Sequence, residues 1–104
     1  MRNPQHKFKK MDEDTVMLFG ELFKLRKDQA QLRKIAPYMI FSETVLGLLA
    51  RHKPTDEAHF SLIEGIDEQK AKDYGNIFTK AIAEFCQVHK LETNMFDNNV
   101  LDKR

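Results

Sequence analysis

The chain has 104 residues, of which 41% are hydrophobic and 32% are charged, and its formal net charge is +1. This composition excludes an intrinsically disordered chain, and no stretch approaches the roughly 20 consecutive apolar residues that span a bilayer. One hydrophobic core is expected at this length, and it leaves little room for a deep catalytic cleft, so the size favours a binding module over a self-sufficient enzyme.

The N-terminal segment and the single cysteine indicate the compartment. Residues 1–11 are polar and basic and lack the apolar centre of a signal peptide. Cys86 is the only cysteine, so no internal disulfide can form, which agrees with a reducing compartment. Because Cys86 falls inside an amphipathic helical pattern, we interpret it as a packed, inert thiol. We therefore expect an intracellular protein.

Charge is distributed unevenly along the chain. Residues 1–54 carry 11 Lys and Arg against 6 Asp and Glu, a net of +5, whereas residues 55–104 carry 6 against 10, a net of −4. This asymmetry predicts an electrostatically bipolar molecule whose first half could meet an anionic partner.

In chain order, apolar residues recur at helical spacing and no segment alternates as a strand would. The first predicted helix runs from about residue 14 to residue 33 behind the acidic cluster 12–14, and Pro37 then opens an apolar connector over 36–41. Ser42 caps a second helix that Lys53 and Pro54 stop. The apolar stripe of the first helix comprises Leu18, Phe19, Leu22, Phe23 and Leu25.

Three further helices are predicted in the second half. Thr55 caps a third helix that Gly65 terminates, and Asp67 caps a fourth over residues 68–74. Gly75 is placed for a left-handed turn, and Asn76 begins the last helix. The sequence therefore predicts an all-α, compact bundle of five helices.

This pattern divides the chain into three parts. Residues 1–10 form a flexible basic segment, residues 11–90 the helical domain, and residues 91–104 a tail that is partly packed or disordered. The composition does not decide between these two states of the tail.

The sequence contains no recognisable motif for metal binding or catalysis. The four histidines, His6, His52, His59 and His89, lack the spacing of a zinc pair, and Cys86 with His89 supplies only two ligands of four. The contiguous acids of residues 12–14 could hold Mg²⁺, but a solvated helix-capping cluster is the better interpretation. No phosphate loop, nucleophile elbow or triad pattern occurs, so we expect no metal, no cofactor and no catalytic residue.

The positive functional signal is a set of basic residues around the first helix. Lys24, Lys27 and Lys34 fall at i, i+3 and i+10 on one stripe, and Tyr38 follows in the connector. Cations that track phosphates and an aromatic ring that stacks on a base are what single-stranded nucleic acid requires. The alternatives are ordinary solvated charges and a half-buried tyrosine. The candidate nucleic-acid face comprises Lys24, Arg26, Lys27, Arg33, Lys34, Tyr38, Arg51 and Lys53.

A glycine turn before the fourth predicted helix offers a second candidate site. Gly65-Ile66-Asp67 has the outline of a helix-hairpin-helix turn, whose backbone N–H groups can bind a phosphate. Asp67 would occupy those donors as an N-cap and repel a phosphate, so we expect a structural role for this turn.

The order and spacing of several short motifs resemble the HRDC domain of RecQ-type DNA helicases. These motifs are Leu18-Phe19-Gly20-Glu21-Leu22, Leu25-Arg26-Lys27, residues 37–42, Pro54-Thr55, and residues 65–75. The segments 85–87 and 93–96 further resemble the stretch on the C-terminal side of this domain in Werner-type helicases.

The resemblance implies a five-helix module that assists a separate motor, which alone uses ATP and Mg²⁺. It implies a monomer, nuclear if the parent is a eukaryotic Werner-type helicase and otherwise intracellular, that contacts single-stranded or branched DNA weakly through its basic face, with the family's aromatic contact at Tyr38. Asp67, where many members have a second glycine, and the acidic second half depart from the pattern. The open alternatives are a protein-interaction module, which docks on the parent helicase or a repair protein through the acidic half or residues 91–96, and an RNase-D-like exonuclease domain.

Overall fold

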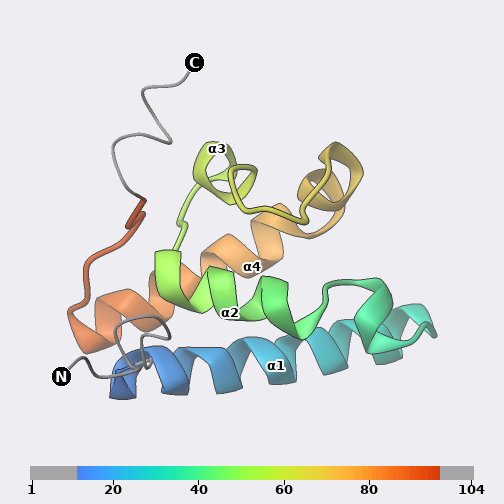
Figure 1. The fold of residues 1–104 in the computed structure, drawn as a ribbon. Coiled ribbons are helices and arrows are strands. Elements are labelled where there is room, and N and C mark those ends of the chain that lie inside the picture. Colours follow the sequence, from blue (N-terminus) through green and yellow to red (C-terminus); the bar gives the residue numbers. More distant parts are fainter. Residues whose placement is uncertain (1–11, 97–104) are drawn as a thin grey trace, which may run out of the picture.

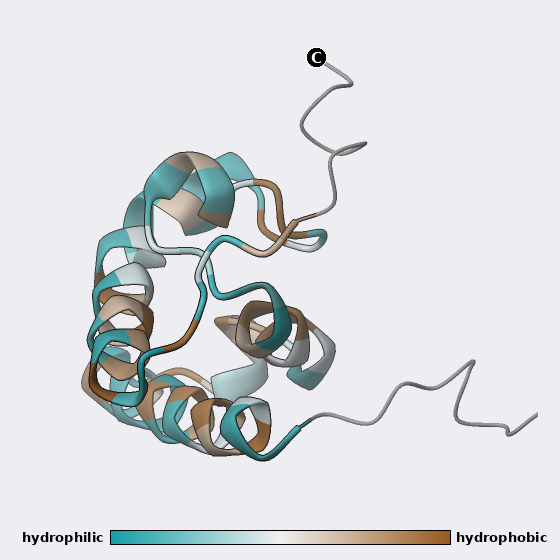
Figure 2. Ribbon diagram, turned by 90° about the vertical axis from the view of Figure 1, so that its left-hand side faces the viewer, coloured by the Kyte–Doolittle hydropathy of each residue, from teal (hydrophilic) through white to brown (hydrophobic). Residues whose placement is uncertain are grey.

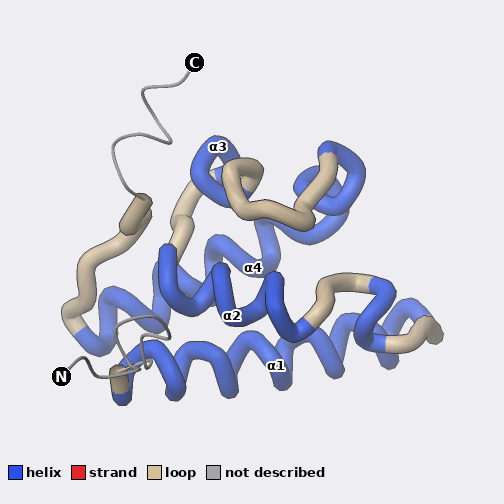
Figure 3. Tube along the Cα trace, viewed as in Figure 1, coloured by secondary structure: helices blue, strands red, loops and turns tan. Residues whose placement is uncertain are grey.

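A computed structural model describes residues 12–96, and within this range the chain is all-helical with no strand. Figure 3 shows helices joined by short loops. The elements are α1 (Glu13–Arg33), the short 3-10 helix η2 (Pro37–Met39), α2 (Glu43–His52), α3 (Glu57–Phe60) and α4 (Glu68–His89).

The two long helices α1 and α4 form the frame of the molecule. α2 and α4 both pack against α1, and α3 packs against α4, as Figure 1 shows. Figure 2 shows hydrophobic segments alternating with hydrophilic ones along these helices, as amphipathic packing requires. None of the helices in residues 12–96 has the length and hydropathy of a membrane span.

An aromatic cluster joins the connector to α3 and α4. The ring of Phe41 meets those of Phe60, Tyr74 and Phe78 edge-on, with centroids 6.0, 5.6 and 5.2 Å apart. All four residues are buried, so the edge-on contacts stabilise the fold beyond what the burial of their apolar area contributes.

Cys86 is also buried, and desolvation raises the pKa of its thiol, which keeps it protonated and unreactive.

Each α-helix begins at a polar side chain that caps a backbone N–H group three residues on. Asp12 accepts from Thr15 N at 2.7 Å, and Ser42 and Asp67 do the same for α2 and α4. Ser42 and Asp67 were predicted as caps and are confirmed, and Asp12 is the member of the predicted acidic cluster over residues 12–14 that caps α1. The predicted cap of the third helix, Thr55, is wrong, because Asp56 caps α3 by accepting from His59 N at 2.8 Å.

Two of these caps predict how stability depends on pH. Backbone hydrogen bonds, from Thr15 to Asp12 and from His59 to Asp56, lower the pKa of each carboxyl. A carboxyl whose pKa is lower in the folded state stabilises the fold above its unfolded pKa of about 4, and this contribution is lost as the pH falls through the folded pKa.

We therefore expect the melting temperature to decrease once the pH is lowered past about 4, because these two carboxylates are then protonated. The double variant Asp12→Asn/Asp56→Asn, which keeps cap acceptors that do not titrate, should lose less stability in that window. Circular dichroism melts from pH 7 to pH 2.5 would check this. Parallel curves for the two proteins would contradict it.

The second half contains two α-helices where three were predicted. Gly75 does not end a helix, because α4 continues through it from Glu68 to His89. Gly75 is instead buried where α3 approaches: a Cβ built there lies 3.5 Å from Phe60 Cδ2. The prediction of five helices is thus wrong in number, since residues 12–96 hold four α-helices and one 3-10 turn, but the all-α compact fold is confirmed.

The third helix is also shorter than predicted. It ends at Phe60, and a series of turns leads to Gly65, which has a φ of 98°. A Cβ built on Gly65 would lie 2.7 Å from Val45 Cγ2, closer than any real contact allows. Both the backbone conformation and the packing against α2 therefore require glycine.

After α4, residues 91–96 fold back along the end of α2. Asn94 N donates to Lys53 O at 2.7 Å, Thr55 N donates to Asn94 Oδ1 at 2.8 Å, and the ring of Phe96 stacks on that of His52 at 4.6 Å. Leu91 and Phe96 pack on the core. Two of the three apolar side chains of this segment are therefore engaged within the domain, whereas the third, Met95, is 45% exposed.

Candidate nucleic-acid interface

Arg26 is not on the outer side of α1, and the prediction that placed it there is corrected. It is 6% exposed, and its guanidinium donates from Nη1 to the Phe41 carbonyl at 2.8 Å. It also lies over the Phe23 ring, 4.8 Å from the centroid. Its Nε is buried without a hydrogen-bond partner among the described residues. Arg26 therefore joins α1 to the start of α2, and its polar groups do not face solvent.

Lys53 is likewise buried, at 5% exposure, and this second placement is also corrected. It forms the left-handed C-cap of α2 with a φ of 55°. Its ammonium donates to Thr15 Oγ1 at 3.1 Å across the α1–α2 contact. The cation consequently fixes two helices together and cannot follow a phosphate backbone.

The remaining predicted residues are exposed but do not share one face. Lys24 lies between Glu21 and Asp28 on the wall of a groove between α1 and α4. The guanidinium of Arg33 is 4.6 Å from the centre of the Tyr74 ring, a cation–π contact with α4. Arg51 lies in the last turn of α2, at the end that contacts the start of α1. The eight predicted residues therefore do not form one continuous basic face.

Three of the predicted residues are exposed on the second half of α1 and the turn that packs against it, and we call them the Tyr38 cluster: Lys27, Lys34 and Tyr38. Lys27 and Lys34 are both exposed, but they do not share a helical stripe as predicted, because Lys34 lies just beyond α1 as its left-handed C-cap with a φ of 60°. Tyr38 sits in η2, with 73% of its surface exposed.

The local sequence explains why Tyr38 points outward. Pro37 opens the 3-10 turn, Ile40 N donates to Pro37 O at 2.9 Å, and the side chain of Ile40 is fully buried. Since Ile40 anchors the turn in the core, the two residues before it lie on the outside. The alternative of a half-buried tyrosine is therefore wrong.

The electrostatics of the described residues differ from those of the whole chain. Residues 12–96 carry 11 Lys and Arg against 14 Asp and Glu, a net of −3, and two of those cations are the buried Arg26 and Lys53. Residues 1–11 carry four basic residues and no acid, so most of the positive excess in the first half lies outside the described residues. Within residues 12–96, an anionic partner would therefore meet a small local site.

The other candidate sites give no catalytic or metal arrangement within the described residues. No group of three or more His, Cys, Asp or Glu side chains between residues 12 and 96 could hold a metal ion. In the Gly65–Asp67 turn, Asp67 accepts the Lys70 N–H at 2.8 Å, so the carboxylate occupies a donor that a phosphate would need. The acidic run at residues 12–14 caps α1, as predicted.

The burial of Arg26 could have been found from spacing alone. It lies four residues after Leu22 and four before Ala30, both buried, so it belongs to the apolar stripe. No local signal marked Lys53, because its partner Thr15 is 38 residues away in the sequence.

Comparison with known proteins agrees with this fold. Residues 16–82 match the HRDC domain family. An ATP-dependent helicase, wrn-1, of Caenorhabditis elegans is 28% identical over 91 residues, which are 88% of this chain and 9% of the helicase. ATP-dependent DNA helicases RecQ of Bacillus subtilis and Haemophilus influenzae are 28% and 33% identical, over 68% and 64% of this chain and 12% and 11% of their own.

Residues 12–96 thus form a small all-helical domain of the class that this family model describes. The chain belongs to the HRDC domain family, an auxiliary domain of RecQ helicases, and the predicted resemblance to Werner-type and other RecQ proteins is confirmed. It spans about a tenth of the length of the curated relatives that it matches.

Proposed function

We propose that this domain makes weak contact with single-stranded or branched DNA through the Tyr38 cluster, as an accessory part of a RecQ-type helicase. The observation that carries the proposal is a tyrosine, 73% exposed in a turn that packs on α1, together with two exposed lysines, one on the second half of that helix and one at its C-cap. An aromatic ring offers a platform for a base, and the ammonium groups can contact flanking phosphates.

The size of the cluster sets the expected strength. With two or three phosphate contacts to a single strand, log K against log salt should have a slope of roughly −1 to −2. The net charge of −3 over residues 12–96 gives this part of the chain no long-range attraction for DNA, so its contribution to the affinity depends on the local contacts. Weak binding is consistent with a module that, linked to a separate motor, raises the overall affinity of the whole protein for DNA.

The relatives support the wider setting of the proposal. Three of them bear the names of ATP-dependent helicases, and this chain matches about a tenth of each. We infer that ATP and Mg²⁺ serve the motor of such a helicase and that this domain supplies binding rather than chemistry. In a eukaryotic Werner-type helicase, the place of action would be the nucleus.

The test is an amide-shift titration of the ¹⁵N-labelled chain with a short oligothymidylate at low and moderate salt. Shifts should centre on residues 34–40, and Tyr38→Ala should weaken binding at least fivefold, because stacking on one base contributes roughly 1–3 kcal/mol. Lys34→Ala should weaken binding twofold to fivefold.

Arg51→Ala is the matched control, since it removes one exposed cation at the opposite end of α2. It should change the affinity less than twofold. An equal loss in Arg51→Ala and Lys34→Ala would show that charge alone drives binding, and the Tyr38 cluster would then not be the site.

A further inference from the structure

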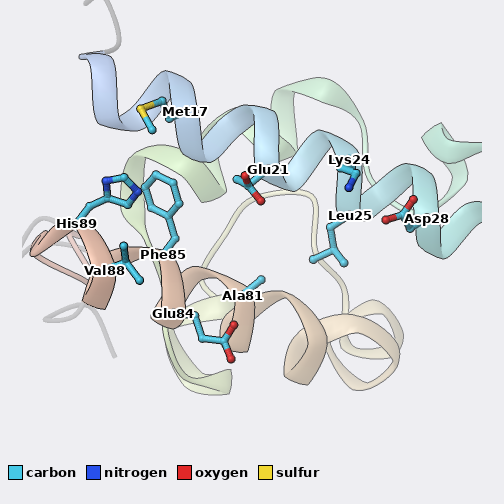
Figure 4. Close-up of a pocket in the computed structure, with 10 residues that line it drawn as sticks. All are labelled: Met17, Glu21, Lys24, Leu25, Asp28, Ala81, Glu84, Phe85, Val88 and His89. Atoms are coloured by element: carbon cyan, nitrogen blue, oxygen red, sulfur yellow. The ribbon is translucent and has the colours of Figure 1, made fainter.

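A broad groove among the described residues lies between α1 and α4, with a volume of about 430 Å³. Its floor includes Leu25 of α1 and Ala81 and Phe85 of α4, as Figure 4 shows. Leu25 and Phe85 are partly buried and pack on the hydrophobic core. The groove is therefore an apolar depression that continues from the core to the surface.

Large apolar side chains stand on both walls at one end of this groove. Met17 of α1 is 47% exposed and Val88 of α4 is 74% exposed. Exposed apolar groups that gather around a groove, rather than lying singly, mark a surface that another molecule can cover.

The polar residues around the apolar floor are mainly acidic. Glu21 and Asp28 lie on the α1 side and Glu84 on the α4 side, against the single ammonium of Lys24. The ring of His89 stacks on Phe85, 4.1 Å between centroids, at the end near Met17. Three carboxylates to one ammonium make this groove repulsive to phosphates and attractive to cations.

We propose that this groove binds a basic amphipathic helix of a partner protein. The apolar side chains of such a helix, at i, i+3 or i+4 and i+7, would cover Leu25, Phe85 and Val88, and lysines or arginines along its edges would pair with the carboxylates. The distance along α1 from Met17 to Asp28 is about 16 Å, the length of about three helical turns. The site is separate from the Tyr38 cluster.

A designed peptide pair tests the charge and shape requirements. The probe is a labelled 14-residue helix with leucines at helical spacing flanked by lysines, and its control replaces every lysine with glutamate. Fluorescence anisotropy with the full 104-residue chain should show at least tenfold tighter binding of the basic peptide. Equal binding of the two peptides would overturn the proposal.

Variants then locate the site. Glu21→Lys/Asp28→Lys should weaken binding of the basic peptide at least tenfold, whereas the matched double variant Glu43→Lys/Glu64→Lys, outside the groove, should weaken it less than threefold. Val88→Asp adds a negative charge but removes an apolar contact, and it should weaken binding. Tighter binding to Val88→Asp, or equal losses in the two double variants, would show diffuse attraction to an acidic protein and overturn the proposal.

Two further measurements separate the remaining outcomes. Sedimentation of the chain alone should show a monomer, and a dimer that Glu21→Lys/Asp28→Lys dissociates would make a second copy the occupant, against the proposal. Tyr38→Ala should leave peptide binding unchanged, and Val88→Asp should leave oligothymidylate binding unchanged. Failure of the groove and failure of the DNA site are therefore distinguishable.

Discussion

Replacing Arg26 with alanine will lower the free energy of unfolding by about 2–4 kcal/mol, because the change leaves a buried carbonyl without its donor and removes packed side-chain volume. The carbonyl is that of Phe41, which accepts from Nη1 at 2.8 Å just before α2 begins. The stem of Arg26 packs in the stripe between Leu22 and Ala30. Urea unfolding followed by circular dichroism measures the loss.

Lys27→Ala provides the matched comparison, since Lys27 is the next residue and is exposed on α1. Its effect on stability should stay within about 0.5 kcal/mol. Arg26→Met keeps an unbranched side chain in the stripe and should recover part of the loss, though not the hydrogen bond. If Arg26→Ala proved as stable as Lys27→Ala, the assignment of Arg26 to the interior would fail.

Replacing Gly65 with alanine will cost about 2–4 kcal/mol, which combines a left-handed backbone for a residue with a Cβ and an overpacked contact. The φ of 98° supplies the first part, and the approach of 2.7 Å to Val45 Cγ2 supplies the second. Shifting the turn to relieve the contact would disturb Ile63 and Ile66, which are buried on either side of it.

Two variants separate these contributions to the Gly65→Ala loss. Because Val45→Ala removes the Cγ2 atom that a Cβ at position 65 would meet, Gly65→Ala should cost less in the Val45→Ala background than in the original chain. The difference should be about 1 kcal/mol or more. Gly75→Ala should instead raise stability by up to about 1 kcal/mol, because its φ is helical and the added Cβ meets Phe60 at an ordinary distance. A loss at Gly75 equal to that at Gly65 would contradict this account.

Local chemistry explains which parts of the fold could be predicted from sequence. The caps at Asp12, Ser42 and Asp67 each depend on a backbone N–H three residues away, so the sequence around them contains the whole interaction. Gly75 was misassigned because glycine often ends a helix, whereas here it lies inside α4 with a helical backbone. Its position next to Phe60 of α3 becomes visible only in three dimensions.

The candidate site was predicted less well because charge on a helix does not by itself indicate exposure. Arg26 was grouped with Lys24 and Lys27 by proximity, although its spacing from Leu22 places it on the buried side. Lys53 required a partner on another helix to be interpreted correctly. The sequence left the exposure of Tyr38 open, because an apolar connector does not by itself show which of its side chains enters the core; the structure buries Ile40 and exposes Tyr38.

The position of Lys53 also bears on how the domain could be carried by neighbouring polypeptide. Its ammonium contacts Thr15 and its carbonyl accepts from Asn94, so the first and last described segments converge at one pole of the molecule. Lys34 and Tyr38 follow the other end of α1, about 30 Å away along its 21 residues, and Lys27 lies on the helix between the two poles. If neighbouring polypeptide held the domain at either of these segments, Tyr38 would lie at the end of the domain farthest from the attachment.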